Sequence, residues 1–135
     1  MENLVKAQIK NNNVWIEGML FTLQDGRSYI INKIDLLDNN DNIHNFNCLG
    51  YEIIPETICR FTGRLDKNNN KIYENDILKC NHYKGVSQVF WDNERECFSI
   101  VNSIHNTKMK LKNIDSIDCE KIGNKFNNPV FINAK

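Results

Sequence analysis

The sequence predicts a mainly β domain of the β-rich α+β class, a small twisted sheet or an SH3-like, partly open barrel. Short runs of β-branched and aromatic residues recur along the 135 residues, and clusters of Asn, Asp and Gly separate them. Few stretches sustain a helical period, so only one or two short helices are expected. We expect an N-terminal β-hairpin region over residues 1–46 and a β domain over residues 47–135, together forming one compact unit.

The first hairpin lies near the N-terminus. Val14–Thr22 has the composition of a strand, Asp25 and Gly26 form a tight-turn signal, and Ser28–Ile31 returns as the second strand. Polar residues at Asn39–Asn42 predict the loop that follows.

A short extended run precedes the only internal proline of the first half. Tyr51–Ile54 reads as β, and Pro55 biases the residue before it away from helix. Because proline suits a first helical position, Pro55–Ile58 is expected to begin a helical turn.

The strongest hairpin signal spans Phe61–Cys80. A turn cluster of Asp66, Asn68, Asn69 and Asn70 separates the β-prone pairs Phe61-Thr62 and Ile72-Tyr73, and Asn75-Asp76 makes a second turn before Ile77–Cys80. Further strands are expected at Gly85–Trp91, Glu96–Val101, Thr107–Ile114 and Asp118–Ile122, followed by an apolar tail at Val130–Ile132.

Three ordered segments carry a resemblance to a known family. They are YEIIPETICRFTG (51–63), FTGRLDKNNNKIYENDILKC (61–80) and IDCEKIGNKFNNPVFI (117–132), and together they resemble the YopX family of phage and prophage proteins. Asn69 and Asn75 stand where the family has glycine, and since Asn tolerates positive φ, we expect the turns to keep their geometry. The resemblance implies a phage or prophage protein in the cytoplasm of a bacterial host, and it implies no catalytic residues.

Composition limits the classes of partner. Seventeen basic residues balance seventeen acidic ones, so the formal net charge is +0, which argues against a protein that coats nucleic acid. No apolar run approaches the roughly 20 residues of a membrane span, and the N-terminus lacks a signal core. We therefore expect a cytoplasmic protein with no membrane partner.

Five cysteines, Cys48, Cys59, Cys80, Cys97 and Cys119, occur without a Cys-x-x-Cys pair. We expect reduced, mostly buried thiols and no zinc site, because the histidines do not supply close ligand pairs. A third, weaker hypothesis is a thiol–imidazole pair, since Cys80 and His82 would share one face of a strand. No cofactor is expected.

Three carboxylates cluster around the main hairpin. Glu74, Asp76 and Asp66 offer oxygen ligands for a metal or an acid–base pair. Turn capping is the simpler interpretation, and it predicts that Asp76→Ala lowers stability by about 0.5–2 kcal/mol.

A lysine stripe provides the alternative function. Lys108, Lys110 and Lys112 alternate with Met109 and Leu111, so on one strand they would share a face and could bind single-stranded nucleic acid by charge and stacking. The competing interpretation, which the neutral net charge favours, is an edge strand that lysines protect from aggregation.

The leading functional hypothesis is a non-enzymatic phage accessory protein that self-associates or binds a host or phage protein. If the N-terminal hairpin projects, Trp15 and Met19 are the candidate subunit or partner contacts. A homo-oligomer is expected, and nucleic-acid binding through the lysine stripe is the alternative.

Overall fold

The computed structural model describes residues 4–36, 45–115 and 118–129. The fold is mainly β with two antiparallel sheets, as predicted, but the described strands do not close into a barrel. The chain divides into two compact units, residues 1–60 and 61–135. The predicted loop at Asn39–Asn42 and the tail at Val130–Ile132 lie outside the described residues.

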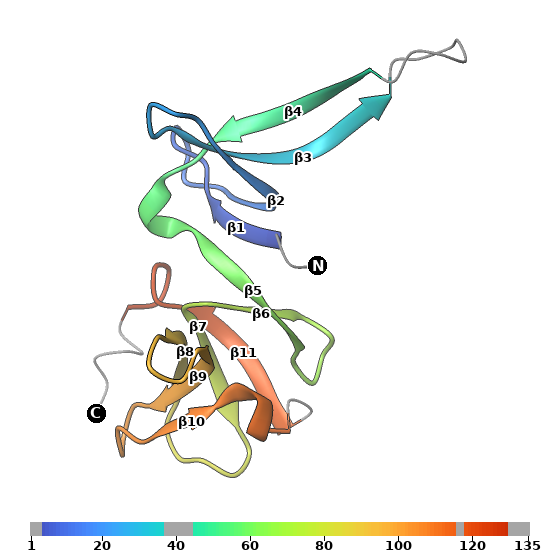
Figure 1. Cartoon of the computed structure of the whole chain (residues 1–135). Helices are drawn as coiled ribbons and strands as arrows, with labels where there is room; N and C mark the ends of the chain where they lie inside the picture. Colours follow the sequence, from blue (N-terminus) through green and yellow to red (C-terminus); the bar gives the residue numbers. More distant parts are fainter. Residues whose placement is uncertain (1–3, 37–44, 116–117, 130–135) are drawn as a thin grey trace. The chain divides into compact units, whose positions relative to one another are not determined.

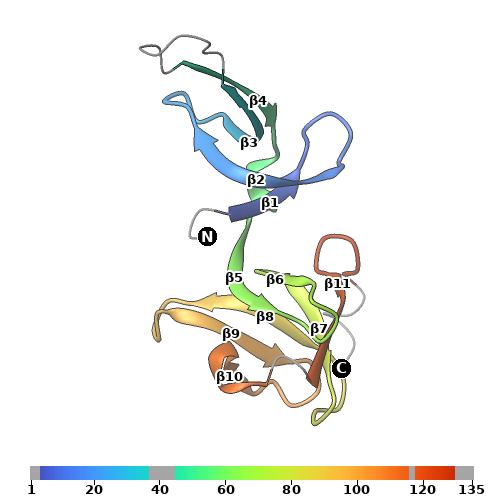
Figure 2. The same cartoon turned by 90° about the vertical axis from the view of Figure 1, so that its right-hand side faces the viewer.

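The N-terminal unit is a sheet with the strand order β4-β3-β2-β1-β5 (Figures 1 and 2). Its elements are β1 (Leu4–Gln8), β2 (Trp15–Thr22), β3 (Ser28–Leu36), β4 (Phe46–Glu52), the 3-10 helix η1 (Pro55–Thr57) and the first residues of β5 (Cys59–Leu65). The predicted hairpin is β2–β3, its turn has Gly26 at φ 95°, and the predicted helical turn at Pro55 is η1.

The core of this unit lies on one face of the sheet. Val5, Ala7, Ile30 and Ile53 are buried there, and Ile16, Leu20 and Ile58 pack against them. Strand β1 was absent from the sequence-based prediction, although Val5 and Ala7 supply half of the buried set. The predicted division after residue 46 stays a prediction, but β4 pairs with β3 from Phe46 to Glu52.

The C-terminal unit contains a second sheet with the order β10-β9-β8-β7-β11. Its strands are β7 (Asp76–Cys80), β8 (Ser87–Asp92), β9 (Cys97–Asn102), β10 (Lys108–Lys110) and β11 (Cys119–Asn124), with a 3-10 helix η2 (Leu111–Asn113) after β10. The later residues of β5 pair with β6 (Lys71–Tyr73). Its buried core contains Ile72, Leu78, Cys80, Val89, Ile100, Leu111, Ile114 and Cys119.

The asparagines that replace the family glycines adopt the expected backbone. Asn69 has φ 65° and Asn75 has φ 70°, both in the left-handed region. Asn reaches that region at lower cost than other side chains, so the β5–β6 hairpin and the turn into β7 are preserved.

One predicted strand is interrupted. Thr107–Ile114 was expected to alternate throughout, but β10 ends at Lys110 and η2 follows. Leu111 is buried with 2% exposure in the core of the C-terminal unit, and the chain enters η2 at this residue instead of continuing the strand. Lys112 therefore lies on η2, and the prediction of one three-lysine strand face is wrong.

Candidate functional site

The N-terminal sheet presents an apolar face opposite its core. Along β2 the side chains alternate, so Ile16 and Leu20 pack into the core while Met19 and Phe21 are exposed. The β2–β3 register places Ile31 beside Met19 and Tyr29 beside Phe21. An antiparallel sheet usually turns a polar face to water, and here that face carries large apolar groups instead.

A β-bulge extends the apolar face along the β3–β4 ribbon. The register shifts between Ile31 and Lys33, which inserts one extra residue and returns Ile34 to the face that Ile31 occupies. Beyond the bulge, Ile34 pairs with Cys48 and Leu36 with Phe46. The ribbon therefore continues the apolar face past the end of β2.

These side chains surround a hollow of about 620 Å³. The lining residues are Met19, Phe21, Leu23, Tyr29, Ile31, Ile34, Phe46, Cys48 and Gly50. Exposure is 43% at Met19, 50% at Phe21, 52% at Ile34 and 58% at Phe46, and Leu36 beside them is 83% exposed. Apolar side chains gathered in this way mark an interaction surface more often than a solvated one. The residues that line this hollow, together with Leu36, are called the apolar face below.

The two predicted contact residues lie on the same side of β2. Met19 lines the hollow, whereas Trp15 lies four residues earlier, where the Lys6 ammonium is 5.2 Å from the centroid of its ring. Sequence reasoning missed Ile34, Leu36, Phe46 and Cys48 because it ended the second strand at Ile31 and assigned no further strand before Tyr51, whereas these residues lie in β3 and β4.

The lysine stripe is divided between two elements. Lys108 and Lys110 lie on β10, which is an edge strand, and the Lys108 ammonium is 5.7 Å from the centroid of the Phe90 ring. Lys112 lines a separate hollow of about 430 Å³ with Arg64 and other residues. The structure therefore keeps two of the three predicted lysines on one strand, and one of them, Lys108, lies beside an aromatic ring.

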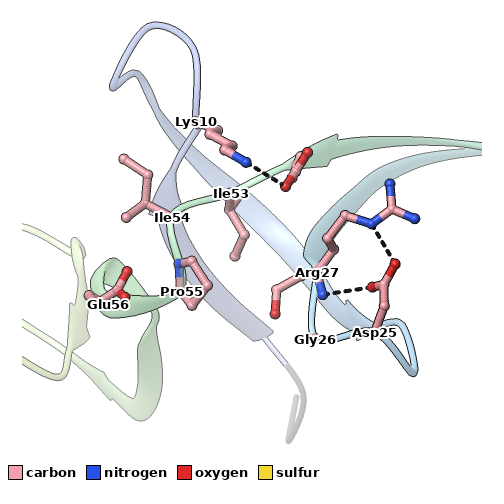
Figure 3. A pocket seen from close by; sticks show the side chains of 10 residues that line it. Lys10, Asp25, Gly26, Arg27, Ile53, Ile54, Pro55 and Glu56 are labelled. Atoms are coloured by element: carbon pink, nitrogen blue, oxygen red, sulfur yellow. Dashed lines mark hydrogen bonds and ion pairs between the residues drawn. The ribbon is translucent and has the colours of Figure 1, made fainter.

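A polar hollow of about 420 Å³ lies at the β2–β3 turn (Figure 3). Ion pairs occupy its walls: the Arg27 Nε–H donates to Asp25 Oδ2 at 2.8 Å, and the Lys10 ammonium donates to Glu52 Oε2 at 3.1 Å. The backbone amide of Arg27 also donates to Asp25. This hydrogen bond, together with the one from the Arg27 side chain, lowers the pKa of the Asp25 carboxyl. Four of the five charged lining residues are neutralised in two pairs, and Glu56 is the fifth, so the hollow carries one carboxylate beyond the two ion pairs.

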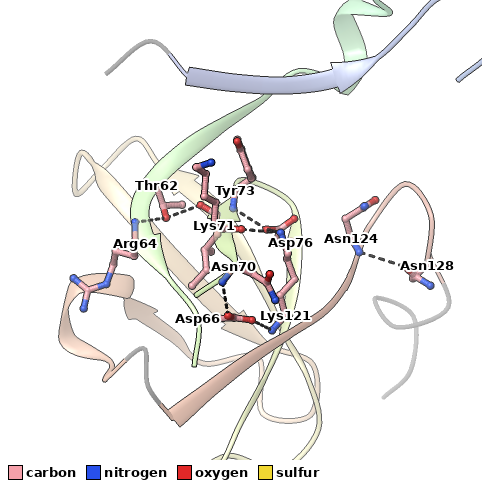
Figure 4. A network of polar contacts seen from close by, with 11 residues as sticks. Thr62, Arg64, Asp66, Asn70, Lys71, Tyr73, Asp76, Lys121, Asn124 and Asn128 are labelled. Atoms are coloured by element: carbon pink, nitrogen blue, oxygen red, sulfur yellow. Dashed lines mark hydrogen bonds and ion pairs between the residues drawn. The ribbon is translucent and has the colours of Figure 1, made fainter. Parts of the chain in front are cut away.

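Asp66 organises the β5–β6 turn (Figure 4). Its Oδ1 accepts hydrogen bonds from the backbone amides of Asn68 and Asn70, and its Oδ2 accepts one from the amide of Lys121, each at 2.9 Å. Burial acts to raise the pKa of Asp66, but the amides of Lys121, Asn70 and Asn68 outweigh it and hold the pKa below the usual 3.8. The capping interpretation accounts for this carboxylate.

We expect Asp66→Asn to destabilise the protein by about 1–3 kcal/mol at neutral pH, because an amide cannot accept at both positions. Asp66 has a lowered folded pKa, so its stabilisation is present above the unfolded value of about 3.9 and is lost as the pH falls through the folded pKa. The stability gap between wild type and variant should therefore shrink on acidification, as measured by urea unfolding. The exposed Asp35→Asn is the matched control, and a gap that is independent of pH would contradict the assignment.

Asp76 is the most buried carboxylate of this network. It has 0% exposure, and its Oδ2 accepts the backbone amide hydrogen of Tyr73 at 2.7 Å and lies 3.5 Å from the Lys121 ammonium. That ammonium also donates to the Lys71 carbonyl at 2.7 Å and is 5.7 Å from the centroid of the Tyr73 ring (Figure 4). These contacts hold β6, β7 and β11 together, so the role of Asp76 is to stabilise the fold.

The expectation of reduced thiols is wrong for two cysteines. Cys80 and Cys119 face each other on β7 and β11, with their Cα atoms 4.1 Å apart, and form a disulfide. Cys48, Cys59 and Cys97 are free. The thiol–imidazole hypothesis fails because Cys80 has no thiol to ionise, and the exposed His82 instead lies 3.5 Å from the Asp118 carboxylate.

Within the described ranges, no group of three or more His, Cys, Asp and Glu side chains is placed to hold a metal ion. Likewise, no described helix has both the length and the apolar character needed to cross a membrane.

Comparison with known proteins agrees with the sequence motifs. No curated protein matches the chain. The family model described as YopX protein matches residues 6–133, so the match includes the strands of the apolar face as well as the β5–β6 hairpin. Because the match covers nearly the whole chain, this protein belongs to the YopX family.

Proposed function

We propose that this protein is a phage or prophage accessory protein of the bacterial cytoplasm that acts by binding protein chains rather than by catalysis. The observation that carries the proposal is the apolar face, where Phe21, Ile34, Leu36 and Phe46 are each at least half exposed around one hollow. Full burial of a large apolar side chain contributes about 1.5–3 kcal/mol, and covering a half-exposed one contributes about half of that, so a partner that covers several of them gains several kcal/mol. Homo-oligomerisation through this face follows from the same argument.

Phe21→Lys should weaken this association by at least roughly tenfold, because binding would then bury a charge in an apolar contact. The matched control is Ile104→Lys, since Ile104 is similarly exposed at 48% but lies in the C-terminal unit. Analytical ultracentrifugation over a range of concentrations and a tagged pull-down from nuclease-treated host lysate provide the two readouts. Equal binding by Phe21→Lys and wild type would contradict the proposal, and so would a wild type that stays monomeric and retains no protein.

Nucleic-acid binding is the second candidate, supported by Lys108 and Lys110 on β10 and by the Phe90 ring of β8 beside Lys108. Two lysines neutralise at most two phosphates of a single strand, which gives a slope of roughly −1.4 for log K against log salt. Neutralising two phosphates contributes little to affinity for nucleic acid, so protein binding is the stronger proposal. Salt-sensitive oligonucleotide binding that Lys108→Glu abolishes would reverse this order.

A further inference from the structure

We propose that β4 forms an antiparallel pair with β4 of a second copy, so that two N-terminal sheets and their apolar faces become continuous across a two-fold axis. This inference rests on the proposed function and names the partner as another copy of the same chain.

The other strands at the ends of the two sheets are protected against such pairing. Strand β6 has three residues, β10 has three residues of which two are lysines, and β11 carries charges at Glu120 and Lys121 next to a bulge. Short length, lysine and bulges are the devices by which proteins prevent edge-to-edge association.

Strand β4 lacks these protections from Phe46 to Tyr51, because the bulge of the β3–β4 pair lies in β3. Strand β4 is seven residues long, and no charged residue or proline occurs from Phe46 to Tyr51. The edge of β4 that faces away from β3 has backbone partners only at its C-terminal end. There the Lys10 amide donates to the Glu52 carbonyl, and Ile9 forms a β-bridge with Ile53. Among the described residues, the edge from Phe46 to Tyr51 therefore offers unpaired backbone groups that can bind another strand.

The β3–β4 ribbon would gain a neighbouring strand that the N-terminal unit does not provide. Strand β2 pairs with β3 only as far as Ile31, and the described part of the ribbon beyond that point consists of β3 and β4 alone (Figures 1 and 2). A two-stranded ribbon is marginally stable in water by itself, and Leu36 and Phe46 are exposed on it. A second copy would convert it into a four-stranded sheet with a continuous apolar face.

The free edge limits the register to a centre at Cys48 or Leu49, and the fit of Phe46 against Gly50 selects Cys48. A two-fold axis perpendicular to the sheet keeps both apolar faces on one side and pairs only residues of the same face. Centring the pairing on Cys48 uses the free edge, and it places Phe46 of each copy opposite Gly50 of the other. A Cβ on Gly50 would make only ordinary contacts, at 3.7 Å or more, and the residue lines the hollow, so the glycine leaves room for an aromatic ring to pack over it. The chain has zero formal net charge, so repulsion between copies is small.

Cross-linking tests this register. In a Cys97→Ser background, the opposed Cys48 thiols should form a disulfide when diamide is added as the oxidant, which takes up the two electrons and two protons that the thiols lose. The matched control adds Cys48→Ser and Leu49→Cys, which moves the thiol one residue along β4 to its opposite face. Covalent dimer from Cys48 and little from Leu49→Cys is the expected result; the reverse order, or no dimer from either, would overturn the inference.

A charge exchange tests the same axis without oxidation. Cys48→Lys and Cys48→Glu should each dimerise at least roughly tenfold more weakly than wild type, because like charges would face each other, and the two variants should pair when mixed. The same exchange at Leu36, on β3 and away from the edge, should give no selective pairing.

If Phe21→Lys abolishes association while neither Cys48 test responds, the apolar face binds protein in another way and only this inference fails. If wild type stays monomeric and retains no protein, the proposed function fails as well.

Discussion

Asp76→Ala is expected to lower the free energy of unfolding by about 3–5 kcal/mol, the loss typical of removing one partner from a buried ion pair. This exceeds the 0.5–2 kcal/mol that an exposed turn cap contributes and that the sequence predicted. The reason is location: Asp76 has 0% exposure, and its removal leaves the Tyr73 amide without this acceptor and the Lys121 ammonium without its carboxylate.

A double-mutant cycle separates the ion pair from simple loss of packing. Lys121→Met removes the ammonium and retains most of the apolar stem, so Asp76→Ala should cost less in that background than in wild type. Urea unfolding followed by circular dichroism measures all four variants. A loss below about 1 kcal/mol for Asp76→Ala, or strictly additive losses, would show that the pair does not contribute as the geometry indicates.

Removing the Cys80–Cys119 disulfide is expected to have a similarly large effect. The two cysteines are 39 residues apart, and closing a loop of that length stabilises a protein by about 4 kcal/mol in the chain-entropy model. Both cysteines are nearly fully buried, at 3% and 1% exposure, so a reductant reaches the bond only when the C-terminal unit opens locally.

Thiol counting and unfolding test this prediction together. Under denaturing, non-reducing conditions we expect three reactive thiols, from Cys48, Cys59 and Cys97. Cys80→Ala combined with Cys119→Ala should shift the urea midpoint to lower concentration, whereas Cys97→Ser, which removes a free thiol, should change it little. Five reactive thiols in the denatured wild type would show that the bond is not formed in that preparation.

The local signals in the sequence were reliable where a few residues decide the backbone. Asn69 and Asn75 have positive φ because the turns require it, and Pro55 begins a 3-10 helix because its fixed φ suits that position. The β2–β3 and β5–β6 hairpins follow from turn residues between β-prone runs.

The candidate site was only partly predictable. The alternation of β2 pointed to Met19, but Ile34 and Phe46 looked like residues near a polar loop until the long β3–β4 pairing placed them on one face. The prediction of a three-lysine strand face was wrong for a different reason. Lys112 continues the alternation in the sequence, but the strand ends at Lys110 and the buried Leu111 begins η2. Pairing partners and burial depend on residues far away in the chain, which a local pattern does not contain.

The sequence by itself determined the mainly β class, the family and the principal turns, because composition and turn chemistry act over a few neighbouring residues. Only the tertiary structure decided that Cys80 meets Cys119, that Asp76 is buried beside Lys121, and that an apolar face continues onto an unprotected edge strand. Each of these depends on which strands pair and in what register, and a register shift of one residue would move every side chain of a strand to the other face of the sheet.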